Sequence, residues 1–381
     1  MDTQIRHPML VQTTHDELMR QQFVHNLRLH LASAIGPGND HVYTARVEPA
    51  FRKKHGRAPK DRHEVRRDMQ HDPYYRLYCA TQRASQEMMW DAVIDSVERD
   101  LPRLKKQASG RAKTASGTLR TDPSFRVPAY HTAADIHLQP GGYHRDTAAD
   151  DMTAGAIYDR SVYIYAIGGL GGLNDDLGQT VVDHVKANFP ALKPRRILDM
   201  GCAVGHSTLP WVDAFPKAEV HGIDCGAGML RYAHARAQNL GKTAHFSQQN
   251  AEKTDFKPGS FDLVVSHIML HETSRSALQA IFAESWRLLA PGGVMLHMDL
   301  PQAHGMAPFP SFMQDWEAYN NNETFAVVCR DLDWPAMAIK AGFKPGKVSV
   351  EQSITHIAAE ELKAGRQPAY ARPFPILVGR K

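Results

Sequence analysis

The chain has 381 residues, of which 43% are hydrophobic and 23% are charged, and its formal net charge is +4. This composition is that of a globular protein with room for a sizeable core, and it excludes a mostly disordered, collagen-like or coiled-coil chain. At about 100–200 residues per domain, the length allows two or three domains. The amino terminus lacks a signal-peptide pattern and the four cysteines form no CxxC pair, so we expect a cytoplasmic protein with reduced thiols.

Residues 1–150 are predicted to form a mainly helical extension. Thr14–Ala32 is a helix candidate, and Pro73–Leu104 has apolar residues that recur at helical spacing along one face. Residues 107–122 are rich in Ser, Gly, Ala and Thr and are predicted to be a flexible loop, and residues 128–147 are predicted to be non-regular. Such an extension can cap a substrate site or form a homodimer.

A basic segment, FRKKHGRAPKDRHEVRR, lies within the extension at residues 51–67. One interpretation is a patch for nucleic acid or another anionic partner, and the other is a solvated helix or loop face. Because no nucleic-acid-binding motif accompanies the segment, we favour the solvated face and expect neither a nucleic-acid nor a membrane partner.

Residues 151–381 are predicted to form a second unit, in which short apolar runs alternate with helical patterns. Strands are expected at residues 196–200, 218–223, 243–247, 261–266, 294–298, 347–350 and 374–378, with helices at 226–238 and 276–289. Buried runs that alternate with helices are typical of a parallel sheet with helices on both faces. The expected fold class is therefore α/β, with a doubly wound sheet that follows the helical extension.

The central motif is ILDMGCAVGHST, residues 197–208, in which an apolar strand and Asp199 lead into a glycine turn and a helix. Gly201 and Gly205 allow the backbone to turn tightly and to approach a ligand beside free helix N–H groups. The glycine order matches neither the dinucleotide fingerprint nor a P-loop. A carboxylate at Asp199 would repel phosphate groups but can help to hold a cationic amino group.

A second acidic residue, Asp224, ends the next expected strand in the segment VHGIDCGAGML. An acid in this place can accept hydrogen bonds from both hydroxyl groups of a ribose. A cofactor that carries a ribose and a cation but no phosphate suggests S-adenosylmethionine. The alternative is that Asp224 only caps the helix that follows it.

Five segments, in order, resemble those of the class I S-adenosylmethionine-dependent methyltransferases, in particular the small-molecule group that includes quinone and sterol methyltransferases. These segments are LDMGCAVG, HGIDCGAGML, QQNAEKTDF, FDLVVSHIMLHE and LLAPGG, within about residues 175–300. The resemblance implies a Rossmann-like seven-stranded methyltransferase sheet, with S-adenosylmethionine as cofactor and S-adenosylhomocysteine as product. The sequence departs from the family pattern at Ala203, where a glycine is common, and residues 1–130 show no comparable resemblance.

The resemblance also implies a set of cofactor-binding residues. They are Asp199, Gly201, Cys202, Ala203, Gly205, Asp224, Cys225, Met229, Asn250, Ala251, Ser266 and His267. Asp224 would hold the ribose, the glycine turn the amino-acid portion, and Asn250 with Ala251 the adenine. A simpler interpretation remains for some of them, because Asn250 also suits a turn and the two cysteines also suit packing.

His267 and His271 follow the fourth strand of the motif order and are the candidate catalytic residues. A histidine there is suited to removing a proton from a hydroxyl, an amine or an acidic carbon. The alternative is that both only shape the pocket, because the sulfonium is already activated and alignment alone accelerates the transfer.

Candidate substrate residues lie outside these motifs. Tyr158 and Tyr163 belong to an aromatic segment that is a candidate lid, and Met313 belongs to an aromatic segment after the fifth strand. His144 lies in a histidine-rich segment with His131 and His137. Since the spacing of that segment matches no standard metal motif, no metal site is predicted there.

The sequence therefore predicts a methyltransferase that acts on a small, aromatic or partly apolar metabolite at an O, N or C atom. One alternative is a methyltransferase for RNA or another macromolecule that uses residues 51–67. The other is a non-catalytic protein that binds a cofactor or a partner.

Overall fold

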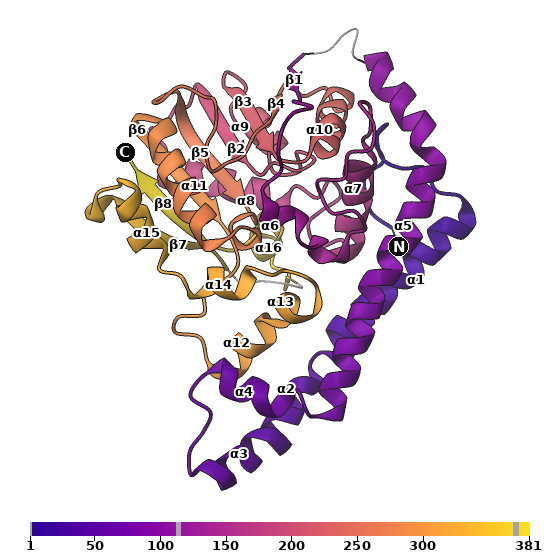
Figure 1. Cartoon of the computed structure of the whole chain (residues 1–381), viewed down its shortest axis with the longest axis vertical. Helices are drawn as coiled ribbons and strands as arrows, with labels where there is room; N and C mark the ends of the chain where they lie inside the picture. Colours follow the sequence, from indigo (N-terminus) through magenta and orange to yellow (C-terminus); the bar gives the residue numbers. More distant parts are fainter. Residues whose placement is uncertain (1, 112–115, 369–372) are drawn as a thin grey trace.

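The computed structural model describes residues 2–111, 116–368 and 373–381. Within these residues, an eight-stranded sheet is covered by helices, and a long helical extension stands beside it (Figure 1). The strand order is β1-β4-β3-β2-β5-β6-β8-β7. The strands are β1 (Leu119–Arg120), β2 (Arg196–Met200), β3 (Glu219–Asp224), β4 (His245–Gln248), β5 (Phe261–His267), β6 (Leu289–Met298), β7 (Val348–Ser353) and β8 (Phe374–Arg380).

The first six strands in chain order are paired in parallel, whereas β8 runs antiparallel between β6 and β7. Strand β2 lies between β3 and β5, so the strand order reverses at β2. In an open α/β sheet, a reversal of this kind leaves a crevice at the carboxyl ends of the strands, where ligands bind. The glycine turn and Asp224 both follow strands at this edge.

Helices cover both faces of the sheet, as the sequence predicted for the α/β class. On one face, α8 (Asp176–Asn188) and α9 (Leu209–Ala214) pack against a cluster that includes Ile197 and Leu263. On the other face, α11 (Arg275–Leu288) and α15 (Trp334–Ala341) pack against a cluster that includes Leu198 and Val264. Successive strand residues therefore point to opposite cores, which explains why the strands read as continuous apolar runs. The remaining helices beside the sheet are α7 (Thr153–Tyr165), α10 (Ala227–Asn239), α16 (His356–Lys363) and the short η5 (Leu270–Glu272) and η6 (Pro345–Lys347).

The sheet contains one strand more than the seven that were predicted. The seven expected strands are β2 to β8, and the additional β1 comes from the extension and pairs in parallel with β4. The prediction of a loop at residues 107–122 is therefore wrong at both ends, because α5 (Pro73–Arg111) continues to Arg111 and Leu119–Arg120 is a strand. Residues 112–115 of that loop lie outside the described residues. Leu119–Arg120 forms a strand because it supplies backbone hydrogen-bond partners to the otherwise open edge of β4.

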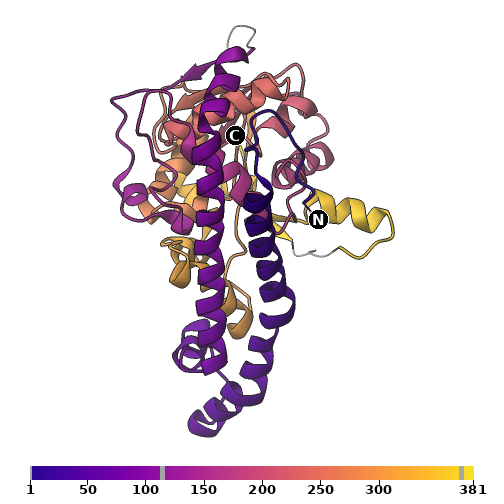
Figure 2. The ribbon, with the colours of Figure 1, turned by 90° about the vertical axis from the view of Figure 1, so that its right-hand side faces the viewer.

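Two long helices, α1 (His15–His30) and α5, lie side by side and form the body of the extension (Figure 2). Thr14 and Glu17 form a capping box that starts α1, and Glu17 also accepts a hydrogen bond from Arg99 of α5 at 2.6 Å. Although α5 has 39 residues, no helix in the described part of the chain is long and apolar enough to cross a membrane. The shorter elements of the extension are η1 (Leu31–Ile35), α2 (Gly38–Val42), η2 (Tyr43–Val47), α3 (Glu48–His55), α4 (Arg62–Met69), α6 (Ala129–Thr132) and η4 (Ile136–Leu138).

The basic segment forms α3, α4 and their connection, at the end of the extension farthest from the sheet (Figure 1). Most of its arginines have partners within the chain: Arg52 pairs with Glu48, Arg57 and Arg67 with Glu64, and Arg62 with Asp315 and Asp331, while Arg66 lies over the ring of Tyr319. The partners of Arg62 lie in and beside α12 (Pro308–Gln314), α13 (Trp316–Asn320) and α14 (Ala326–Asp331), the helices that follow β6. Arg62 and Arg66 thus join the tip of the extension to the helices that follow β6, whereas the other three arginines pair within the tip.

Candidate functional site

A cavity of about 710 Å³ lies at the carboxyl edge of the sheet. Its wall includes Gly201, Asp224 and Asn250 from the ends of the strands. Trp90 and Tyr143 from the extension also line it. The volume lies within the range of about 300–1,000 Å³ that is usual for small-molecule sites.

The glycine turn after β2 forms one side of this cavity. Gly201, Ala203 and Gly205 all have positive φ values, of 69°, 45° and 78°. A Cβ atom at Gly201 would lie 2.4 Å from Cγ of Met269, so only glycine fits there. The backbone N–H groups of Gly201 and Cys202 both donate to the carbonyl of Ile223, which fixes the turn to the end of β3. Gly201 and Ala203 line the cavity, whereas Cys202 and Gly205 pack behind the turn and are not part of its wall.

Asp224 is held rigidly at the end of β3 by its neighbours. Its Oδ2 accepts a hydrogen bond from the N–H of Ala203 at 3.0 Å, and its Oδ1 accepts one from the N–H of Gly226 at 2.8 Å. Each oxygen keeps a second lone pair that can accept from a ribose hydroxyl. Burial raises the pKa of this carboxyl, although both backbone hydrogen bonds lower it. The bond to Gly226 reaches the residue before α10, but Asp224 does not cap this helix, because the N-cap is Gly226 and no side chain bonds the first turn.

The segment predicted to hold an adenine lines the cavity beside Asp224. Asn250, Ala251, Cys225 and Met229 all belong to the wall. The Oδ1 of Asn250 accepts from the N–H of Glu252 at 2.8 Å. Asn250 therefore forms a turn as well as facing the cavity, which combines the two interpretations that the sequence left open.

Like Cys202 and Gly205, the predicted cofactor residues Asp199 and Ser266 do not belong to the cavity wall. The carboxylate of Asp199 accepts from the hydroxyl of Thr208 at 2.5 Å and lies 3.2 Å from Nδ1 of His267. Ser266 is fully buried and shares a hydrogen bond of 2.7 Å with His297. Because strand side chains alternate, these two point into the sheet layers rather than towards the open edge. The prediction that Asp199 and Ser266 contact the cofactor directly is therefore wrong.

His267 does line the cavity, and its Nε2 has no hydrogen-bond partner within the described residues. Asp199 orients the ring through Nδ1 at 3.2 Å. Asp199 thus acts on the cavity indirectly, by holding His267.

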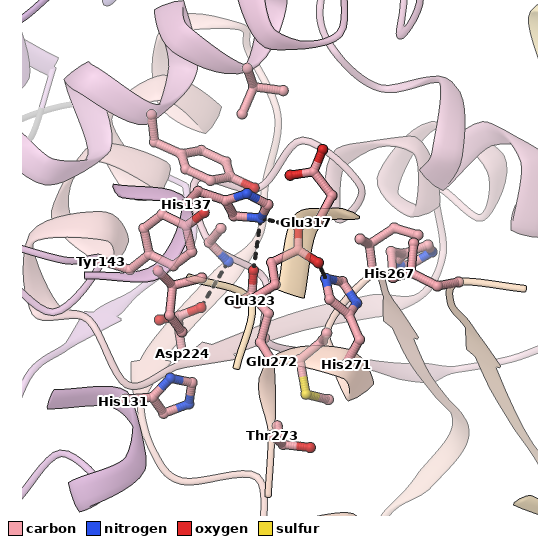
Figure 3. Close-up of a pocket in the computed structure, with 18 of the residues that line it drawn as sticks. His131, His137, Tyr143, Asp224, His267, His271, Glu272, Thr273, Glu317 and Glu323 are labelled. Carbon is pink, nitrogen blue, oxygen red and sulfur yellow. Dashed lines mark hydrogen bonds and ion pairs between the residues drawn. The ribbon is translucent and has the colours of Figure 1, made fainter. Parts of the chain in front are cut away.

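The half-buried His137 and the buried His271 and Glu323 form a polar cluster in the same cavity, and their side chains point towards one another (Figure 3). The Nε2 of His137 lies 3.2 Å from Oε1 of Glu323, and the Nε2 of His271 lies 3.9 Å from Oε2 of Glu323. On its other side, His271 Nδ1 makes a contact of 2.7 Å with Asp299, which follows β6. Glu272 lines the same region, 3.6 Å from His137.

The charges around the cluster determine the protonation of its histidines. Burial lowers the pKa of His271, but the ion pair with Asp299 and the nearby glutamates outweigh burial and raise the pKa to about 10. The pKa of His137 is also raised, because Glu323 and Glu272 outweigh burial. His271 therefore keeps its proton at neutral pH in the ligand-free chain, which does not favour the predicted role of general base.

Aromatic side chains form the wall between the polar cluster and the sheet. Tyr158 lies parallel to the ring of His206, with centroids 5.9 Å apart, and meets Tyr143 edge to face at 5.3 Å. Tyr165, Tyr78, Tyr130, Trp90 and Trp316 complete this wall, to which His144 and Met313 also belong. Tyr163 does not line the cavity, because it points away from it and its hydroxyl bonds Thr3 at 2.8 Å. We therefore remove Tyr163 from the substrate residues.

A buried carboxylate, Asp159 of α7, ties the glycine turn to the amino-terminal segment. Its oxygens lie 2.7 Å from Nε2 of His206, 2.6 Å from the hydroxyl of Tyr232 and 3.1 Å from Nε2 of His7. Arg236 of α10 lies 3.7 Å away. The first residues of the chain thus support the cavity from behind.

Sequence reasoning did not select Glu323, and it mentioned His137 only as part of the histidine-rich segment. The local signals are weak, because His137, His271 and Glu323 come from three segments that are far apart in the chain. Two weak signals were present, the histidine-rich irregular segment and the Asn-rich turn NNNE at residues 320–323. Both are typical of loops that carry function.

Comparison with known proteins agrees with this geometry. Residues 197–293 match the family model described as a methyltransferase domain. The chain is 30% identical over 145 residues to malonyl-[acyl-carrier protein] O-methyltransferase of Legionella pneumophila, which covers 38% of this chain and 48% of the relative. It is 32% identical over 108 residues to demethylmenaquinone methyltransferase of Thermus thermophilus, which covers 28% and 48%.

A solved structure of phosphoethanolamine N-methyltransferase 2 from Haemonchus contortus, with S-adenosylhomocysteine, is 19% identical, with a TM-score of 0.43, over 62% of this chain and 60% of that one. The chain spans about half the length of the two curated relatives named above. The domain match, the strand order and the acid after β3 together define the class: the chain contains a class I S-adenosylmethionine-dependent methyltransferase domain.

The residues at the sheet edge fit the cofactor of this class. The wall beside β2 and β3 offers a carboxylate with free lone pairs and a turn with a close backbone approach at Gly201. Among the described residues, this part of the wall has no Lys or Arg that would select a phosphate. Arg330 also lines the cavity, but it is paired with Asp315 in the layer of α12 to α14.

Proposed function

We propose that the chain transfers a methyl group from S-adenosylmethionine to a small, partly aromatic acceptor. The observation that carries this proposal is the single cavity that joins Asp224 at the sheet edge to the polar cluster of His137, His271 and Glu323. One end of this cavity suits a ribose, and the other end suits a polar group of a second molecule. A site that holds both molecules aligns their reacting atoms, which is the main contribution that such a protein makes to the reaction.

The residues at the sheet edge would hold the cofactor. Asp224 accepts hydrogen bonds from the ribose hydroxyls, Gly201 and Ala203 approach the amino-acid portion, and Asn250 with Ala251 contacts the adenine. When bound, the cofactor supplies a methyl group on a positively charged sulfur. His267, the last residue of β5, also lines the cavity.

The aromatic wall and the polar cluster would hold the acceptor. Tyr143, Tyr158 and Trp90 offer flat apolar surfaces to a ring or a short chain. His137, His271 and the three glutamates Glu272, Glu317 and Glu323 offer partners to a hydroxyl or an amine. We therefore assign the acceptor to small molecules with one polar group and an apolar body.

The extension, residues 1–150, would act as the cap of this site rather than as a separate binding unit. Tyr78 and Trp90 of α5, with His137 and Tyr143 after it, belong to the cavity wall. The basic segment lies at the far end of the extension, and most of its arginines are paired. These observations favour a small acceptor over RNA.

The proposal is tested by release of S-adenosylhomocysteine from the full chain, with panels of phenols, aliphatic alcohols, carboxylic acids and amines, and with RNA. We expect release that depends on a small acceptor and that is lost in Asp224→Asn. The control is Asp213→Asn, which changes an exposed carboxylate that pairs with Lys242 on the surface. Release with RNA alone would support the macromolecular alternative. Cofactor binding without turnover on any panel would support the non-catalytic one.

A further inference from the structure

We propose that His137, His271 and Glu323 bind a divalent first-row transition-metal ion, such as zinc or manganese, at the acceptor end of the cavity. The role of the ion in holding an acceptor rests on the proposed function, whereas its binding does not. The two histidines and the carboxylate come from η4, from η5 and from the turn between α13 and α14.

The geometry suits an ion among the three side chains. One ligand atom of each residue lies within 4.8 Å of those of the other two. The Oε1 of Glu323 lies 3.2 Å from Nε2 of His137, and its Oε2 lies 3.9 Å from Nε2 of His271. Both distances are near the separation of about 3.4 Å between two ligands of a tetrahedral zinc ion at about 2.0–2.1 Å. Small side-chain shifts would complete the coordination. Two imidazoles and a carboxylate are donors for zinc, iron, manganese or nickel rather than for calcium.

Glu323 gives a second, independent indication of a missing partner. Its side chain is 4% exposed, and its Oε2 has no hydrogen-bond partner within the described residues. A buried carboxylate oxygen without a partner is unfavourable, because it has lost water and gained nothing in exchange. A cation between Oε2 and Nε2 of His271 would satisfy both atoms.

The surroundings of His271 hold its ring in the orientation that a metal ligand needs. Asp299 Oδ1 lies 2.7 Å from Nδ1, and Asp299 is itself fixed by the N–H groups of Leu270 and Leu300, both at 2.7 Å. When the ion displaces the proton that Nε2 holds in the ligand-free chain, the carboxylate on Nδ1 directs the lone pair of Nε2 towards the ion. The contact leaves Nε2 facing Glu323 and the cavity.

His137 requires one local change to bind in the same way. Its Nδ1 lies 3.0 Å from the side-chain amide nitrogen of Asn321, whose oxygen is buried and has no hydrogen-bond partner among the residues that the structure describes. A rotation of this amide by 180° would place its oxygen against Nδ1–H of His137 and leave Nε2 free for the ion. The rotation would break the hydrogen bond that the amide nitrogen of Asn321 donates to Glu317.

An ion at this place would define the acceptor as one that reacts through a hydroxyl oxygen. The oxygen would bind at a coordination position that faces the cavity, and its proton would pass to Glu272, because a bound cation lowers the pKa of a hydroxyl group. The oxygen then forms the new bond to the methyl carbon. The electron pair of the broken carbon–sulfur bond stays on sulfur, which becomes a neutral thioether.

The test uses the tag-free full chain after treatment with a chelator. Calorimetric titration with Zn²⁺ and with Mn²⁺ should show one ion bound per chain, and Co²⁺ should give visible absorption bands of a nitrogen and oxygen site. We expect Glu323→Gln and His271→Gln each to weaken binding at least about tenfold, and Asp299→Asn to weaken it by about 10–100-fold. The matched control is His131→Gln, which changes a histidine of the same cavity wall outside the cluster.

Failure of this inference is distinguishable from failure of the proposed function, because S-adenosylhomocysteine binding is measured on the same stripped chain and on each variant. Retained cofactor binding shows that the variant is folded. If the stripped chain binds the cofactor but no ion, or if His131→Gln weakens ion binding as much as Glu323→Gln does, the metal site is overturned. If the chain binds the ion but not the cofactor, the proposed function fails and the metal site stands.

Discussion

Ala203 shows how a single residue carries strain at the cofactor side of the cavity. It adopts φ 45° in a turn whose two other left-handed residues are glycines. Its N–H is needed there, because it donates to Asp224 at 3.0 Å. A side chain in this conformation costs about 1–2 kcal/mol, so the turn keeps its hydrogen bond at the expense of stability.

Replacing Ala203 with glycine is therefore expected to stabilise the chain. The relief of strain exceeds the added chain entropy of glycine, about 0.5–1 kcal/mol, and leaves a net gain of about 0.5–1 kcal/mol in the free energy of unfolding. Urea denaturation of both chains measures this gain in the free energy of unfolding. The matched control is Ala359→Gly within α16, where φ is helical and a loss of about 1 kcal/mol is expected. A loss of stability in Ala203→Gly as well would contradict this account of the turn.

Site residues were predictable from sequence where they share a short motif. Gly201, Asp224 and Asn250 each follow a strand within a contiguous segment, and all three line the cavity. This reasoning fails for neighbouring positions in the motifs. Asp199 lies just before Gly201, and Ser266 just before His267, but both side chains face the sheet layers. The partnership of His137 with Glu323 was not predictable, because tertiary packing alone places them together.

Among the elements, α7 depends on one buried acid for its position. Asp159 is 1% exposed and accepts bonds from the amino-terminal segment, from the glycine turn and from α10. Burial raises the pKa of this carboxyl, but Arg236, His206 and His7 outweigh burial and hold it well below its usual range. A carboxylate with a lowered pKa stabilises the fold at pH values above its ordinary pKa of 3.8, and this contribution is lost as the pH falls further.

We expect Asp159→Asn to lower the free energy of unfolding by about 3–5 kcal/mol at pH 7, because it leaves the buried guanidinium of Arg236 without its nearby carboxylate. The difference in the free energy of unfolding between the variant and the original chain should become smaller as the pH falls below about 4. In that range, the unfolded original chain binds a proton that the folded chain does not. Urea denaturation at several pH values measures both effects. Asp213→Asn, at the surface, should change stability by less than about 1 kcal/mol. A difference for Asp159→Asn that stays constant into the acid range would contradict the lowered pKa.

Helices and strands were predictable from sequence where their residues form a clear apolar pattern. The strands β2 and β5 were expected almost at their observed bounds, because both faces of each are buried and each contains an uninterrupted apolar run, Ile197–Leu198 and Leu263–Val265. Strand β1 was missed, because two residues carry no periodicity and their pairing with β4 depends on distant parts of the chain. The last turns of α5 were missed because serine and glycine in that stretch are also common in loops.

At the scale of the whole molecule, the cavity exists only because the extension and the sheet meet. The sheet edge supplies Asp224 and His271, while α5 and the segment after it supply Trp90, His137 and Tyr143. The tip of the extension is joined to the layer of α12 to α14 by Arg62, which binds Asp315 at 2.7 Å and Asp331 at 2.6 Å. The extension thus forms part of the cavity wall and is joined at its tip to the layer of α12 to α14.

The most direct test of the account is calorimetric titration of the full chain with S-adenosylmethionine and S-adenosylhomocysteine, with NAD as a control ligand, repeated on Asp224→Asn. We predict that both sulfur cofactors bind and NAD does not. The variant should lose about 10–100-fold in affinity, because each hydrogen bond to a charged group contributes about 1.5–3 kcal/mol. If neither sulfur cofactor binds, or if Asp224→Asn binds them as tightly as the original chain, the placement of the cofactor at the end of β3 is wrong.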